Sequence, residues 1–218
     1  IWLCLGFVAF SFFRLHEAFP VLMPLRIPQL LALPTLLVLF WHIGVKKQVL
    51  PYWTPGLTAF ATFFAIVTLG IPFASNVGMA MEYWTATYIK IGIMTIAIAW
   101  LVRKDTDFAL ALRIIVVSGV AVAIVAISNK LAGIGLVEGT RVTIGRDFGS
   151  VLGDPNDLSL VLTFPLSFAI SLATTRQRWY MRLFGLAATG IIVWAVLCTQ
   201  SRGGLLGTLA VFGITGLR

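Results

Sequence analysis

Charged residues are scarce in this chain. Only 11% of its 218 residues are Asp, Glu, Lys or Arg, whereas 59% are hydrophobic. A water-soluble domain of this length has too little interior to bury so much apolar surface, so a soluble globular fold is excluded. The composition therefore predicts an integral membrane protein, for which the lipid bilayer is the main solvent.

Cysteine and histidine are also rare. The two cysteines, Cys4 and Cys198, lie in apolar runs without CxxC or Cys/His spacing, which argues against a disulfide framework and a zinc site. His16 and His42 have no neighbours typical of a metal site or a catalytic triad. No HExxH, GxSxG or Walker pattern occurs. We therefore expect neither a metal nor a cofactor.

Basic residues exceed acidic ones, and the formal net charge is +8. They lie at the ends of apolar runs and not in an aromatic-interleaved patch, so nucleic acid is not expected as a partner. Alternate connections are rich in them: Lys46 and Lys47, Arg103 and Lys104, then Arg176, Arg178 and Arg182. The positive-inside rule places these connections in the cytoplasm. The intervening connections, which hold Arg141, Arg146 and Arg202, then face the outer side.

The apolar runs predict the fold class. A helix that crosses the bilayer needs about 20 apolar residues, within a range of about 17 to 25. By this rule we expect an all-α fold, a polytopic transmembrane helical bundle of about eight spans, forming a single transmembrane domain over residues 1–218. The expected spans are residues 1–13, 27–44, 57–74, 84–102, 108–131, 157–175, 183–200 and 203–217.

One connection, residues 132–156, is longer than the others. With the start of the next span it contains RVTIGRDFGSVLGDPND at 141–157, in which arginines, aspartates and glycines alternate with apolar residues. Long connections in compact proteins are usually functional or disordered. The apolar residues in this one predict a packed re-entrant or interfacial segment.

A capping pattern ends this connection. Asp154 can cap free amides, Pro155 suits a first helical turn, and Asp157 suits the positive end of the helix dipole. Helix capping is sufficient to explain these residues. They can also form a polar rim, together with Asn156, that holds sugar hydroxyls, and the two roles do not exclude each other.

Arginine is the second feature of this connection. Arg141 and Arg146 are five residues apart. Arginine at a membrane surface can simply reach toward lipid headgroups. It is also the side chain best suited to gripping a phosphate through two parallel hydrogen bonds, and it stays charged in a dry pocket. Two arginines near one helix start predict a phosphate clamp.

A third arginine, Arg202, lies in TQSRGG at 199–204, which separates the last two expected spans with almost no loop. So short a turn places Arg202 at the membrane surface beside exposed backbone amides, an arrangement that favours an anionic ligand. An interfacial anchor is the alternative. Gly203 and Gly207 then form a small-xxx-small pair, which predicts the close approach of another helix.

Lys90 lies within the fourth expected span, toward its outer end. A charge inside the membrane is a functional candidate by default, because burying it in hydrocarbon is costly. A lysine near the end of a helix can also extend its ammonium group to the interface. Lys90 is therefore a candidate substrate contact with a purely structural alternative.

Two of these motifs resemble a known family. GDPND at 153–157 before an apolar helix, and TQSRGG at 199–204, resemble the bacterial O-antigen ligase and O-antigen polymerase superfamily of multi-span membrane glycosyltransferases. The early FFRLHEAFPVLMPLRIP at 12–28 is similar to the amino-terminal part of many members. The resemblance covers most of the chain, and SRGG is its more telling motif.

The resemblance implies a function. Such enzymes transfer a glycan from an undecaprenyl diphosphate carrier to a glycan, lipid A core or protein acceptor, on the periplasmic face of the bacterial inner membrane. Catalysis is metal-independent, and arginines neutralise the diphosphate. Arg202 matches the arginine of the SRG motif, and Arg146 is the best match for the second. The substrate-binding candidates are Arg141, Asp154, Asn156, Asp157 and Lys90.

The resemblance also bears on the extent of the chain. Family members usually carry a later periplasmic loop with a histidine that helps activate the acceptor. This chain begins with Ile1 in place of Met and stops directly after an apolar run. We therefore expect a fragment of a longer chain, in which that loop and the C-terminal spans are missing.

Two other functions are compatible with the same residues. A transporter or flippase for an anionic lipid or solute would use the arginines for binding alone, although the inverted repeats and broken helices typical of transporters are not evident here. A non-catalytic scaffold of a polysaccharide assembly complex would tolerate substitutions in the outer charged cluster. If the protein is a glycosyltransferase, three activities are alternatives: O-antigen ligation, O-antigen polymerisation and protein glycosylation.

Overall fold

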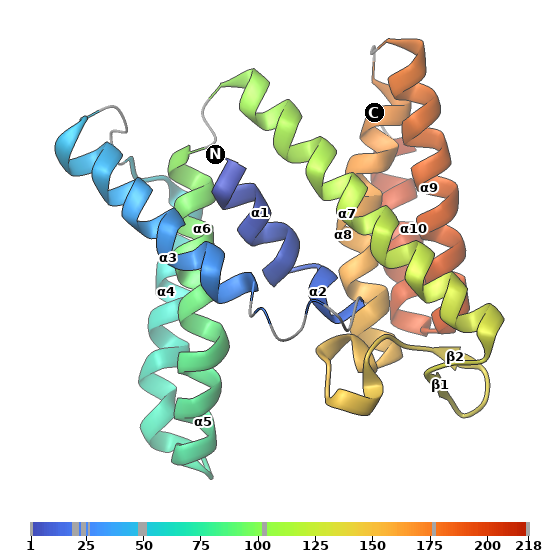
Figure 1. The fold of residues 1–218 in the computed structure, drawn as a ribbon, viewed down its shortest axis with the longest axis horizontal. Helices are drawn as coiled ribbons and strands as arrows, with labels where there is room; N and C mark the ends of the chain where they lie inside the picture. The colour runs from blue at the N-terminus through green and yellow to red at the C-terminus, as the bar shows by residue number, and fades with distance from the viewer. Residues whose placement is uncertain are drawn as a thin grey trace. The chain divides into compact units, whose positions relative to one another are not determined.

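The computed structural model describes residues 2–18, 22, 25, 27–47, 52–101, 104–175 and 178–216 (Figure 1). These residues are mostly helical, and one hairpin of two short strands is the only sheet among them, so the expected all-α class is confirmed. The chain packs as two compact units. Unit 1 comprises Ile1–Val8 and Pro28–Phe108, and unit 2 comprises Ala9–Ile27 and Ala109–Arg218. The expectation of a single domain stays a prediction.

Unit 1 contains most of the elements that precede α7. α1 (Trp2–Ser11) begins in it and ends in unit 2. The other elements are α3 (Ile27–Phe40), η2 (Trp41–Val45), α4 (Pro55–Gly70), η3 (Ile71–Phe73), α5 (Val77–Tyr83), η4 (Trp84–Tyr88) and α6 (Ile89–Leu101). The elements η2 and η4 are π-helical turns, and η3 is a 3₁₀ turn.

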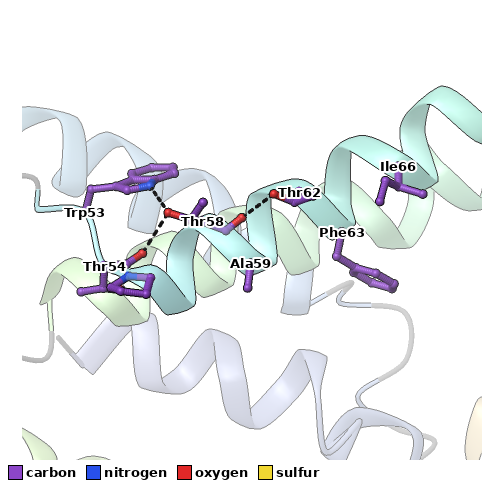
Figure 2. A pocket seen from close by; sticks show the side chains of 8 residues that line it. Trp53, Thr54, Thr58, Ala59, Thr62, Phe63 and Ile66 are labelled. Carbon is purple, nitrogen blue, oxygen red and sulfur yellow. Dashed lines mark hydrogen bonds between the residues drawn. The ribbon is translucent and has the colours of Figure 1, made fainter.

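The start of α4 shows how this unit satisfies polar groups. Thr54 is extended, and its hydroxyl accepts a hydrogen bond from the backbone of Leu57 at 3.2 Å, while Pro55 occupies the first turn. Figure 2 shows the face of α4 that follows, where the indole of Trp53 donates to Thr58 and Thr62 donates to the Thr58 carbonyl. Hydroxyl groups bonded to their own helix in this way do not need water, which suits a helix surrounded by lipid.

Unit 2 contains the remaining helices and the hairpin. α7 (Asp105–Ala132) begins in unit 1 and continues here. The other elements are α2 (Leu15–Ala18), β1 (Leu136–Val137), β2 (Arg141–Val142), η5 (Arg146–Phe148), η6 (Val151–Gly153), α8 (Pro155–Thr174), α9 (Trp179–Thr199) and α10 (Arg202–Gly216). α8, α9 and α10 run side by side, and the hairpin lies at one end of this bundle (Figure 1).

Glycines bring the helices of unit 2 close together. A Cβ atom on Gly119 of α7 would lie 2.4 Å from the Pro165 ring on α8, and one on Gly185 of α9 would lie 2.6 Å from the Ala173 nitrogen on α8. Helices in lipid gain little from the hydrophobic effect, so close van der Waals packing at small residues holds them together. α8 is therefore the central helix of the unit, with α7, α9 and α10 against it.

The prediction that Gly203 and Gly207 allow another helix to approach the last helix closely is partly wrong. A Cβ on Gly203 would meet only the Ser201 hydroxyl at 3.9 Å, whereas one on Gly204 would overlap Ser159 of α8 at 2.4 Å. Gly207 does face α8, since its Cβ would lie 3.2 Å from Thr163. The close approach therefore uses Gly204 and Gly207, an i, i+3 pair on one helix face.

The count of about eight spans is not supported, although each expected span contains a helix. Four helical stretches of the described residues are long and apolar enough to cross a bilayer: Pro55–Phe73, Asp105–Ala132, Pro155–Thr174 and Trp179–Thr199. The main helices of the other four expected spans, α1, α3, α6 and α10, have only 10, 14, 13 and 15 residues. The π-helical turns η2 and η4 adjoin α3 and α6 directly, and their flanking residues keep right-handed helical angles, so the helical path continues through both turns. The expected ends at Ile1, Val102 and Leu217 lie outside the described residues.

The contact between α7 and α8 gives a first prediction. Gly119→Ala would drive a methyl group into Pro165, so we expect the free energy of unfolding to fall by about 1–3 kcal/mol. Thermal unfolding of the purified protein in detergent would measure this loss. Gly190→Ala on α9 is the matched control, because a Cβ there meets nothing within 4 Å. Equal melting temperatures for the two variants would contradict the close approach.

Candidate functional site

The long connection between α7 and α8 is folded against the bundle. β1 and β2 form an antiparallel pair, and the Asn129 amide of α7 donates to the Thr143 carbonyl at 3.1 Å. Val142, Ile144 and Leu152 are buried at 0%, 2% and 0% exposure, in the same core cluster as residues of α8 and α9. The prediction of a packed segment is therefore confirmed.

Arg146 lies in a tight turn of this connection. Gly145 and Gly149 flank it in the left-handed region, with φ of 68° and 70°, which glycine adopts without strain. The Ser150 amide donates to the Gly145 carbonyl at 3.0 Å and closes the turn. A Cβ on Gly153 would lie 2.9 Å from the Arg146 Cα, so the arginine backbone lies directly beside the residue that precedes Asp154.

The start of α8 has the predicted cap. Asp154 is the N-cap residue, its carboxylate accepts from the Asn156 amide at 2.7 Å, and Pro155 occupies the first turn. Asp157 lies in the same turn, where a negative charge is favourable to the helix dipole. The capping prediction is confirmed. Asp154, Asn156 and Asp157 all retain exposed surface at this end of the unit.

The turn between α9 and α10 is as short as the sequence predicted. α9 ends at Thr199, Gln200 adopts a left-handed conformation with φ of 51°, and α10 begins at Arg202. The Ser201 side chain is buried, and its hydroxyl accepts from the Gly204 amide at 3.2 Å, which caps α10. This geometry fixes the backbone of Arg202, while its side chain is exposed.

Asn156 joins these segments. Its carboxamide oxygen accepts a hydrogen bond from an Arg141 Nη atom at 3.0 Å and another from the Ser201 hydroxyl at 2.9 Å. Arg141 also donates from Nε to the Thr199 carbonyl at 3.3 Å. The hairpin, the start of α8 and the turn before Arg202 therefore meet at one end of unit 2.

The three arginines differ in how they are bound. Arg141 is half-buried and donates to two partners. Arg146 and Arg202 are exposed, and within the described part of the chain no hydrogen bond or ion pair engages either guanidinium group. The amino-terminal ends of α8 and α10 lie beside them and carry positive partial charge. Chemically, this end of unit 2 can receive an anion with several negative oxygens.

Lys90 makes none of the contacts that join Arg141, Asn156 and Ser201. It lies in the first turn of α6, in unit 1, and takes no part in the contacts described above. Among the described residues no group of three or more His, Cys, Asp or Glu side chains could hold a metal ion. The candidate site therefore consists of arginines, polar side chains and helix ends.

Sequence reasoning missed a second set of polar residues at this site. Glu17 of α2 is almost buried, at 9% exposure, and its carboxylate accepts from Arg14 at 2.5 Å and from the Ser150 hydroxyl. Burial lowers the pKa of the adjacent His16, and the nearby Glu17 carboxylate offsets only part of this effect. The available signal was the RLHE stretch, which places opposite charges three residues apart.

Asn156 provides a second prediction. Asn156→Ala removes the oxygen that serves both Arg141 and Ser201, so we expect the free energy of unfolding to fall by about 1–3 kcal/mol. Asn156→Asp retains an acceptor for both donors and should keep most of the stability. Chemical denaturation in detergent would compare them, and equal losses for the two variants would argue against the shared acceptor.

Comparisons with known proteins do not assign this arrangement to a family. No family model, no curated protein and no solved structure matches the chain. The chemistry available at the site must therefore be inferred from its own side chains: two arginines without hydrogen-bond or ion-pair partners among the described residues, a third that donates to two partners, and two helix amino-terminal ends.

Proposed function

We propose that this protein is a membrane glycosyltransferase that transfers a glycan from an undecaprenyl diphosphate carrier to an acceptor at the periplasmic face of the bacterial inner membrane. Arg202 and Arg146 contact the diphosphate in this proposal, and Arg141 supports them. Asp154, Asn156 and Asp157 line the sugar-binding rim at the start of α8. The resemblance of GDPND and TQSRGG to the O-antigen ligase and polymerase superfamily supports this choice of reaction.

One observation carries the proposal. The guanidinium groups of Arg146 and Arg202 are exposed and unengaged within the described residues, whereas Arg141 donates to both Asn156 and Thr199. An arginine that holds parts of the fold together is expected to have partners in the protein, as Arg141 does. Two arginines free of such partners, next to two positive helix ends, favour an external anion as the partner.

The charge of the leaving group supports the same reaction. When the bond between the glycan and the carrier breaks, negative charge develops on the diphosphate oxygen that leaves. Cations held in place beforehand stabilise that charge without rearranging during the reaction. Arginine forms two parallel hydrogen bonds with phosphate oxygens and keeps its proton at all relevant pH values. The acceptor is a glycan, a lipid A core or a protein.

The third prediction tests this reaction. Arg202→Ala and Arg146→Ala should each lower the rate of glycan transfer by ~10²–10³, since each removes one donor to the developing charge. The assay supplies labelled undecaprenyl diphosphate-linked glycan and an acceptor to the protein in membranes, and it measures the release of carrier diphosphate. Arg113→Ala is the control, because Arg113 is an exposed arginine of α7 outside the proposed site.

The same assay separates the proposal from its alternatives. A transporter or flippase would move the labelled lipid across the membrane without releasing carrier diphosphate. A scaffold would bind or organise other proteins and would tolerate both arginine substitutions. Transfer at the normal rate by Arg202→Ala, at an unchanged level of protein in the membrane, would remove Arg202 from the mechanism.

A further inference from the structure

A buried carboxylate contacts the turn that carries Arg146. Glu17 has 9% of its surface exposed, and its two oxygens have different partners. One oxygen accepts from Arg14 Nη1 at 2.5 Å, and the other accepts from the Ser150 hydroxyl. His16 is the other titratable group beside it, with Nε2 at 3.9 Å. Hydrogen bonds to a charged carboxylate are roughly twice as strong as neutral ones. Glu17 therefore holds both Arg14 and Ser150 firmly.

The segment that holds Glu17 is itself anchored to unit 2. Phe13 is completely buried in the core cluster that contains α8 residues, and the Phe12 ring packs edge-on against Phe164 of α8 with 5.3 Å between centroids. The chain then bends at Arg14, which adopts a left-handed φ of 50°, and the Glu17 amide donates to the Arg14 carbonyl at 2.8 Å. Aromatic packing therefore fixes the carboxylate relative to the start of the α8 bundle.

Ser150 connects Glu17 to the turn that carries Arg146. Its amide closes the turn onto Gly145, and its hydroxyl accepts from the Leu152 amide at 3.0 Å while donating to Glu17. Among the described residues, Glu17 is the only one outside the connection between α7 and α8 that hydrogen-bonds to residues 145–150. The glycines at both ends of η5 allow many backbone conformations, so this bond restricts where Arg146 can lie.

We propose that Glu17 is a positioning residue for Arg146, acting through Ser150 and held in place by Arg14. This inference rests on the proposed function, since it assigns Glu17 to the placement of a diphosphate contact. Arg14 neutralises the carboxylate, so that Glu17 holds the turn without drawing the Arg146 guanidinium away from an anionic ligand. The ligand class that this placement would serve is a lipid diphosphate, whose binding requires Arg146 at a fixed position.

The experiment uses the protein in detergent and farnesyl diphosphate as the probe. Glu17→Gln and Ser150→Ala should each weaken probe binding about tenfold, as expected when coupled groups lose one contact. Ser150→Thr keeps the hydroxyl and should bind normally. In the Arg146→Ala background, Glu17→Gln should add no further loss, because Glu17 acts through Arg146. Glu82→Gln, an exposed glutamate of α5, is the matched control.

Amide hydrogen exchange of residues 145–152 provides the second readout. Glu17→Gln should accelerate exchange there, and Glu82→Gln should not. Unchanged exchange, or faster exchange with unchanged probe affinity, would overturn the positioning role. Additive losses in the double variant would also overturn it, since they would indicate a general structural effect. If the wild-type protein fails to bind the probe while exchange still responds to Glu17→Gln, the diphosphate function fails and Glu17 is only a structural anchor of the turn.

Discussion

The carboxamide oxygen of Asn156 is the point at which the polar end of unit 2 is joined. It accepts from Arg141 on the hairpin and from Ser201 before α10, so three segments distant in sequence share one acceptor. Ser201 is buried, and a buried hydroxyl without a partner is costly, so its bond to Asn156 holds the turn before α10 in place. This constraint fixes the backbone of Arg202 and leaves its side chain free to face outward.

Close packing below that end gives the arrangement its rigidity. Gly119, Gly185 and Gly204 let α7, α9 and α10 approach α8 at distances that no side chain would permit. Dispersion contacts replace the hydrophobic effect as the cohesive force between helices in lipid. The ends of these helices therefore keep fixed relative positions within unit 2, which is what a preorganised electrostatic site needs.

Charge is divided between structure and function at this end. Arg141 donates a hydrogen bond to Asn156, and Arg14 donates one to Glu17. Arg146 and Arg202, in contrast, are exposed. The proposed diphosphate contacts and the proposed positioning role of Glu17 both follow from this division.

Composition was sufficient to predict a membrane protein, because so much apolar surface has no other stable place, and the lengths of the apolar runs predicted the helical class. Local rules were also sufficient for the Asp154 cap and the tight turn at Gln200. The number of helices long enough to span could not be predicted, because the length of an apolar run does not fix where a helix begins and ends: α1, α3, α6 and α10 have only 10, 14, 13 and 15 residues. Which arginines are engaged, and that Glu17 reaches Ser150 across 133 residues of chain, depended on tertiary packing. Contacts between residues far apart in sequence leave no local pattern that periodicity or capping rules can detect.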